Sequence, residues 1–158
     1  MEICYLDFDG VLHDDAVYYS LDRDIHLATP GRVLFEWMPI LEELLMPRPE
    51  LKIVLSTTWV RQWSLEFAKS RLSPALQARV IGATLDIRET QKLEFDLMRR
   101  GAQVLADVER RQPTSWFALD NDPAGWPPSA RARLVLTDDR LGLSEERVQA
   151  AIKAILAT

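Results

Sequence analysis

Short, almost wholly apolar segments recur along this chain, and stretches with helical periodicity separate them. Segments of this kind are typical of strands buried on both faces of a parallel sheet. Strands that alternate with helices predict an α/β fold with a mainly parallel central sheet. The predicted strands cover residues 3–8, 52–55, 115–119 and 134–136, and 79–81 is a weaker candidate.

Apolar residues at helical spacing predict four helices between and after these strands. Pro39 fits the first turn of the first helix, and Pro47 stops it. The polar stretch 13–32 shows neither pattern, and we expect a hairpin-like flap or loop there, inserted into one domain spanning residues 1–158. The other helices are marked by Trp59, Trp63 and Phe67, by Leu93, Leu97 and Val104, and by Val148, Ile152 and Ile155.

Composition narrows the classes of function. A chain of 158 residues with 47% hydrophobic residues fits one ordinary globular domain. The net charge of −5 argues against extended binding to a nucleic-acid backbone, but it leaves room for a small site for a phosphorylated molecule or a nucleic-acid end. The single cysteine, the lack of a signal-peptide pattern at the N-terminus and the lack of a long apolar segment predict a cytoplasmic protein without a membrane span.

Two carboxylates follow the first predicted strand. Asp7 and Asp9 are two residues apart on an extended segment, so we expect their side chains to share one side. The carboxyl end of a strand is where ligands bind in open α/β sheets. Adjacent carboxylates repel each other unless a cation neutralises them, and oxygen ligands favour Mg²⁺. A solvated Asp-Gly turn at Asp9-Gly10 is the alternative.

Polar residues also end two further predicted strands. Ser56 and Thr57 follow strand 52–55, where a hydroxyl can bind a phosphoryl oxygen or simply cap the next helix. Asp120 follows strand 115–119 directly. If the three strands are parallel neighbours, these side chains converge on one crevice.

With these motifs in place, the chain resembles the haloacid dehalogenase-like (HAD) superfamily, from residue 4 to about residue 143. The family's first motif is matched by Asp7-Phe8-Asp9-Gly10-Val11, its second by Ser56 or Thr57, and its fourth by Asp120 with Asn121 and Asp122 following. The chain is most similar to the small capless HAD domain of RNA-repair (Swiss Army Knife) proteins. The segments that carry this likeness are Leu-Asp-Phe-Asp-Gly-Val-Leu-His, Leu-Ser-Thr-Thr-Trp, Gly-Ala-Thr and Ala-Leu-Asp-Asn-Asp.

The resemblance implies a three-layer Rossmann-like domain and a phosphatase that acts through an aspartyl-phosphate. Asp7 would be the nucleophile and Asp9 the general acid and base. Mg²⁺ would be held by Asp7, the backbone carbonyl of Asp9 and Asp120. Asn121 stands where the paired form of the fourth motif has an acid, and Asp122 is the residue that would compensate. Ser56, Thr57 and Gly10 would contact the substrate.

The family's third motif is a basic residue that stabilises the phosphoryl group. Arg88 and Lys92, one turn apart near the start of the third predicted helix, are the candidates that we favour. Arg110 and Arg111 lie closer to the next predicted strand and are the alternatives. Lys92 could instead form a surface pair with Asp96 at i, i+4.

The spacing of the motifs leaves no room for a large cap domain, so we expect an open site. An open site suits bulky phosphomonoesters, including nucleic-acid ends, as well as small phosphorylated molecules. His13 and His26 show no metal-ligand pattern, and we expect them on the surface or in the flap. The alternative function is a non-catalytic or degenerate HAD-fold binding or regulatory module. The oligomeric state is not predicted.

Overall fold

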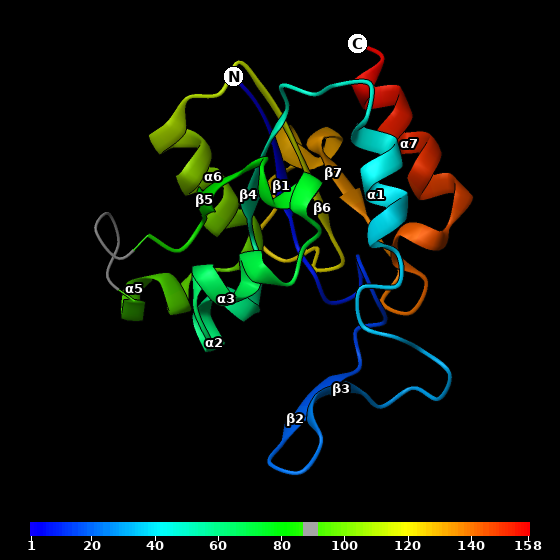
Figure 1. Cartoon of the computed structure of the whole chain (residues 1–158). Helices are drawn as coiled ribbons and strands as arrows, with labels where there is room; N and C mark the ends of the chain where they lie inside the picture. The colour runs from blue at the N-terminus through cyan, green and yellow to red at the C-terminus, as the bar shows by residue number, and fades with distance from the viewer. Residues whose placement is uncertain (87–91) are drawn as a thin grey trace.

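The computed structural model describes residues 1–86 and 92–158, and its centre is a parallel sheet with strand order β5-β4-β1-β6-β7 (Figure 1). The predicted α/β fold with a mainly parallel sheet is confirmed. Its strands are β1 (Glu2–Leu6), β4 (Lys52–Leu55), β5 (Val80–Ala83), β6 (Ser115–Asp120) and β7 (Leu134–Leu136). The helices are α1 (Met38–Leu45), α2 (Thr58–Gln62), α3 (Leu65–Ser70), α4 (Pro74–Gln77), α5 (Lys92–Leu97), α6 (Arg100–Arg111) and α7 (Glu146–Leu156), with the 3₁₀ turns η1 (Pro128–Arg133) and η2 (Gly142–Ser144).

Helices cover both faces of the sheet, which gives three layers. Alternate residues of β1 point to opposite faces, as the pleat requires. Cys4 and Leu6 join a core that includes α1 and α7, whereas Ile3 and Tyr5 join a second core that includes Val104 of α6. Figure 1 shows α1 and α7 together on one side of the sheet and α6 on the other. Because both faces are covered, the strands are apolar except at their ends, and this is why their positions can be predicted.

The stretch 13–32 contains an antiparallel hairpin of β2 (Val17–Ser20) and β3 (Asp24–Leu27). The hairpin extends away from the sheet (Figure 1). Tyr18 and Tyr19 in β2 are exposed. In the described part of the chain, no helix has the length and apolar character needed to cross a membrane.

Two predicted helices are each broken into shorter ones. The helix predicted around residues 59–67 ends at Gln62, and α3 begins after Ser64, whose hydroxyl accepts a hydrogen bond from the Phe67 amide at 3.0 Å. The third predicted helix is divided at residues 98–99 into α5 and α6. The Gln103 side chain of α6 donates to the backbone oxygens of Phe95 and Met98 at the end of α5. Apolar spacing alone does not detect these caps, so the predicted helices were too long.

Candidate active site

Asp7 and Asp120 lie at the carboxyl ends of neighbouring strands. β1 and β6 are paired in parallel, with Leu6 opposite Leu119, so the next residue of each strand reaches the same edge of the sheet. Both side chains are almost completely buried. Asp7 Oδ1 accepts the amide of Phe8 at 2.8 Å, and Asp120 Oδ1 accepts the amide of Asp122 at 2.9 Å. The crevice therefore holds two buried, oriented carboxyl groups.

Burial and crowding make the ionised forms of these two carboxyls unfavourable. Burial, followed by the charges of Asp120 and Asp9, raises the pKa of Asp7 well above its usual range, while Arg100 opposes the rise. Burial also raises the pKa of Asp120, and Arg100 again opposes the change. Both carboxyl groups can be ionised together only if a positive charge lies beside them.

Arg100, the first residue of α6, supplies a positive charge at this point. Its Nη1 lies 3.0 Å from Asp120 Oδ2 and 3.5 Å from Asp7 Oδ1, and it also donates to the backbone oxygen of Ser56. The side chain is only 11% exposed. A guanidinium so placed can stabilise negative charge that develops on a group bound beside Asp7.

Arg100 was not among the predicted basic residues. The prediction assumed one long helix beginning near Lys92, whereas a new helix begins at Arg100. Gly101 inside an otherwise helical pattern is the signal in the sequence that could have marked this break. Lys92 is exposed, and its charge acts on Asp96. Arg88 lies outside the described residues.

Arg110 and Arg111 belong to a different cluster. Both donate to Asp107, a buried carboxylate of α6, at 3.0 and 2.8 Å. Asp107 also accepts a 2.8 Å hydrogen bond from the Tyr5 hydroxyl of β1, and Arg110 donates to the backbone oxygen of Thr84 after β5. These contacts fasten α6 to the sheet at a distance from its first residue.

Ser56 and Thr57 differ in what their hydroxyls do. Thr57 caps α2, since its Oγ1 accepts the amide of Trp59 at 3.3 Å. Ser56 Oγ is buried, and among the described residues it has no hydrogen-bond partner. Buried polar atoms are seldom left unsatisfied in folded proteins. Ser56 is therefore the hydroxyl with unused capacity for a substrate oxygen.

Asp9 is held by two ring N–H groups. His13 Nε2 and Trp59 Nε1 each lie 2.8 Å from Asp9 Oδ1. The expectation that His13 lies on the surface or in the flap is wrong, because its side chain is completely buried in the core. Its partners lie far away in sequence, apart from Asp9, and no local pattern reveals them.

Gly10 permits a close approach between two of the predicted site segments. Its φ of +78° is a left-handed conformation that favours glycine. A Cβ at this position would lie 2.4 Å from Asn121 Nδ2. Asn121 in turn donates to Asp139 Oδ1 at 2.8 Å and more weakly to Asp15 Oδ2 at 3.4 Å. The Asn121 amide is thus engaged with these loop carboxylates.

Asp7 and Asp120 supply part of the ligand set that a hard cation such as Mg²⁺ requires. Among residues 1–86 and 92–158, no three His, Cys, Asp or Glu side chains gather as a ready metal-binding group. Asp7 and Asp120 nevertheless offer adjacent buried oxygen donors, and Arg100 would balance their negative charge only in part when both ionise. Mg²⁺ is typically bound by one or two carboxylates, with water and substrate phosphate completing its shell. The donor set agrees with that pattern.

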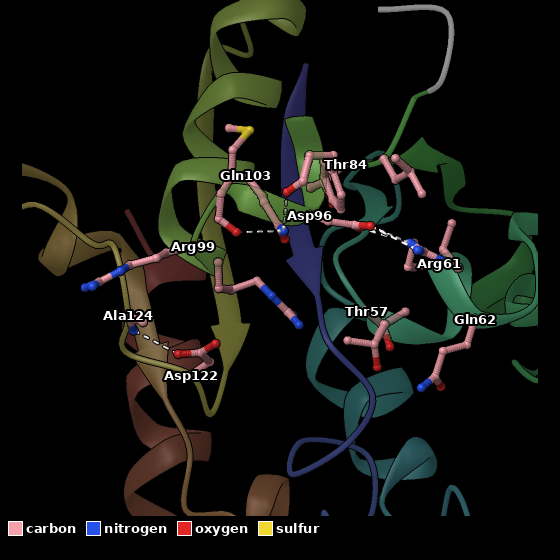
Figure 2. Close-up of a pocket in the computed structure, with 15 residues that line it drawn as sticks. Thr57, Arg61, Gln62, Thr84, Asp96, Arg99, Gln103, Asp122 and Ala124 are labelled. Carbon is pink, nitrogen blue, oxygen red and sulfur yellow. Dashed lines mark hydrogen bonds and ion pairs between the residues drawn. The ribbon is translucent and has the colours of Figure 1, made fainter. Parts of the chain in front are cut away.

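An open cavity of about 530 Å³ adjoins Arg100. Figure 2 shows Thr57, Arg61 and Gln62 from the α2 segment on one side of it, and Arg99, Gln103 and Asp122 on the other. Arg61 is paired with Asp96 at 2.9 Å, and Asp122 Oδ1 accepts the amide of Ala124 at 2.9 Å. Polar and charged side chains stand on both walls, and the cavity meets the buried carboxylates through Arg100, which lines it and contacts Asp7 and Asp120.

A parallel sheet that carries carboxylates at the ends of β1 and β6, a serine at the end of β4 and a nearby arginine defines an α/β domain of the HAD class. The family model described as the HAD domain in Swiss Army Knife RNA repair proteins matches residues 3–148, and the chain belongs to this family. The resemblance drawn from the motifs is confirmed. The HAD superfamily consists mostly of phosphohydrolases. Comparisons with curated proteins and with solved structures give no match.

Proposed function

We propose that this protein is a Mg²⁺-dependent phosphohydrolase that cleaves a phosphomonoester through an aspartyl-phosphate on Asp7. The observation that carries this proposal is the buried pair of Asp7 and Asp120, bridged by Arg100 at the carboxyl edge of the sheet. The family is described as a domain of RNA repair proteins, and for this reason we favour a nucleic-acid end as the substrate class.

Asp7 would attack phosphorus and displace the leaving oxygen, which gives an acyl phosphate and an alcohol. Water would then cleave that acyl phosphate and restore the carboxylate. Arg100 and the Ser56 hydroxyl would bind the phosphoryl oxygens as negative charge develops on them. Asp7 is oriented for attack because the Phe8 amide holds its Oδ1.

Asp9 would protonate the leaving oxygen and afterwards remove a proton from the attacking water. Its side chain is 27% exposed, so unlike Asp7 it faces space that a substrate can enter. Mg²⁺, when bound, would offset the charge of the phosphoryl group, and Asp7, Asp120 and the backbone carbonyl of Asp9 would hold it. Asp122, whose carboxylate lines the cavity, is the further candidate ligand.

The open cavity supports a bulky substrate. A nucleic-acid end can enter without a domain closing over it, and the net charge of −5 makes extended contact with the backbone unfavourable. Thr57 and Gly10 would border the bound phosphoryl group. The cytoplasmic location stays a prediction.

A panel of phosphorylated metabolites and of 3′- and 5′-phosphorylated oligonucleotides, assayed with and without Mg²⁺, tests the proposal. We expect phosphate release that depends on Mg²⁺, and a phosphoryl group on Asp7 when the quenched enzyme is mapped by mass spectrometry. Asp7→Asn should abolish both, and Glu109→Gln, a change of another carboxylate outside the site, should abolish neither. A folded wild-type protein that releases no phosphate and carries no phosphoryl group would favour a non-catalytic binding module instead.

A further inference from the structure

We propose that His13 and Trp59 are positioning residues that fix one oxygen of Asp9 and leave the other oxygen to exchange the proton. This inference rests on the proposed function, since it concerns the general acid of that reaction. It starts from the observation that both ring N–H groups point to the same atom, Asp9 Oδ1, at 2.8 Å each. Among residues 1–86 and 92–158, the side-chain hydrogen bonds to Asp9 end on Oδ1, and none is found to Oδ2.

The hydrogen bonds of His13 define which of its nitrogens carries the proton. The Phe35 amide donates to His13 Nδ1 at 3.0 Å, and an amide N–H can only donate. Nδ1 must therefore be the unprotonated nitrogen, and Nε2 carries the hydrogen that is directed at Asp9. His13 thus acts as a neutral donor whose orientation is set by the backbone of a distant segment.

Aromatic packing holds both donors in place. His13 and Trp59 are completely buried. The Phe35 ring stands edge-on to His13 with centroids 4.8 Å apart, and it also packs against Trp59 at 5.4 Å. Phe8, which lies between Asp7 and Asp9, packs against Trp59 at 5.6 Å. The two donors, His13 and Trp59, are therefore packed in the core, whereas their acceptor, the Asp9 side chain, is partly exposed.

Two donors on one oxygen have a specific effect on a carboxylate. The terminal torsion of an aspartate side chain is soft, and one contact would leave its plane free to turn. Two N–H groups from different elements restrict both the position of Oδ1 and the plane of the group, so Oδ2 is presented in one direction. Placing reactive groups by rigid neighbours is what proton transfer at a fixed distance requires.

The test compares two substrates that differ in their need for an acid. p-Nitrophenyl phosphate releases the stable p-nitrophenolate ion, which needs little protonation. A simple alkyl phosphate releases an alkoxide oxygen, which must take a proton from an acid as it leaves. The ratio kcat/KM reports the steps up to phosphoryl transfer to Asp7, so slow hydrolysis of the acyl phosphate does not affect it. We expect Asp9→Asn to lower kcat/KM for the alkyl ester by about 10² to 10⁴-fold and to affect the aryl ester far less.

Trp59→Phe keeps an aromatic ring and removes one N–H donor. It should lower kcat/KM for the alkyl ester by about tenfold, which is the worth of about 1.4 kcal/mol, and change the aryl ester by less than about threefold. In the Asp9→Asn background, Trp59→Phe should not lower kcat/KM for the alkyl ester any further, because the Trp59 N–H acts on the reaction only through Asp9. His13→Gln, which retains a donor, should keep more activity than His13→Leu.

Tyr5→Phe is the matched control, because it also removes a buried donor to a carboxylate, but the acceptor is Asp107. It should leave the ratio of the two substrates unchanged. Equal losses on both esters in Trp59→Phe and His13→Gln would show that the rings only pack, and would overturn the inference. If Asp9→Asn itself shows no preference between the esters, the proposed role of Asp9 is wrong and the inference falls with it. Trp59→Phe decides the matter alone if His13→Leu does not fold.

Discussion

Gly101→Ala should both destabilise the fold and move the arginine of the site. Gly101 follows Arg100 in the first turn of α6, and its amide donates to the backbone oxygen of Ala124 at 2.9 Å. A Cβ on Gly101 would lie 2.5 Å from the carbonyl carbon and oxygen of Gly125 and 2.6 Å from the Trp126 nitrogen. All three are backbone atoms that cannot turn aside.

The size of the effect follows from these distances. Ordinary contacts begin near 3.4 Å, so helix and loop must separate by about 0.9 Å. Overpacking of this kind costs about 1–3 kcal/mol. The gain from alanine's helix propensity and the loss of a weakened amide hydrogen bond are each about 1 kcal/mol and nearly cancel. For 158 residues, a loss of about 1–3 kcal/mol lowers the Tm by about 3–9 °C.

Thermal denaturation and kcat/KM measure the two consequences. A displacement of Arg100 by nearly 1 Å should lower kcat/KM by about a hundredfold. Gly82→Ala is the control, because its Cβ would meet only the Nη2 end of the Arg111 side chain, at 2.7 Å, and that end can move. The reasoning is refuted if Gly101→Ala keeps the Tm and activity of the wild type, or if Gly82→Ala loses as much stability.

Three further predictions concern the site itself. The raised pKa of Asp7 means that the folded protein holds a proton on this group at pH values where the unfolded chain has released it, so the stability that Asp7 contributes is lost as pH rises above about 4. At pH 7 without added metal, Asp7→Asn should therefore unfold at a higher urea concentration than the wild type. This difference should shrink as the pH is lowered toward 4. Ser56→Ala should change the free energy of unfolding little while lowering activity, whereas Thr57→Ala should cost about 1 kcal/mol through its lost cap, as measured by chemical denaturation. Arg100→Gln should lower kcat/KM by about 10² to 10³-fold, and Lys92→Gln should leave it near the wild-type value in the same assay.

The features that could be predicted from the sequence are those whose contacts produce a local pattern of residues. Strands buried on two faces read as apolar runs, and residues such as Asp7 at their carboxyl ends mark the edge where ligands bind. The apolar spacing does not reveal Arg100, because it runs across the helix break on which the place of Arg100 depends, and Gly101 is the one local signal of that break. His13 was misplaced for a related reason: its orientation depends on Phe35 and its environment on Trp59, which are 22 and 46 residues away. Long-range partners of this kind are decided by the fold, not by neighbours in the chain.

The attachment of α6 at both ends bears on how tightly the site can bind a phosphoryl group. Asp107 ties the later turns of the helix to Tyr5 of β1, and Gly101 seats its first turn against the loop after β6. Immobilising a free arginine on binding costs up to about 1.5 kcal/mol of side-chain entropy. Arg100 is already held by three oxygen partners on a helix that is attached at both ends. Much of that entropy loss is therefore incurred during folding and not on binding. The backbone amides of α6 should be among those that exchange hydrogen only when the whole domain unfolds.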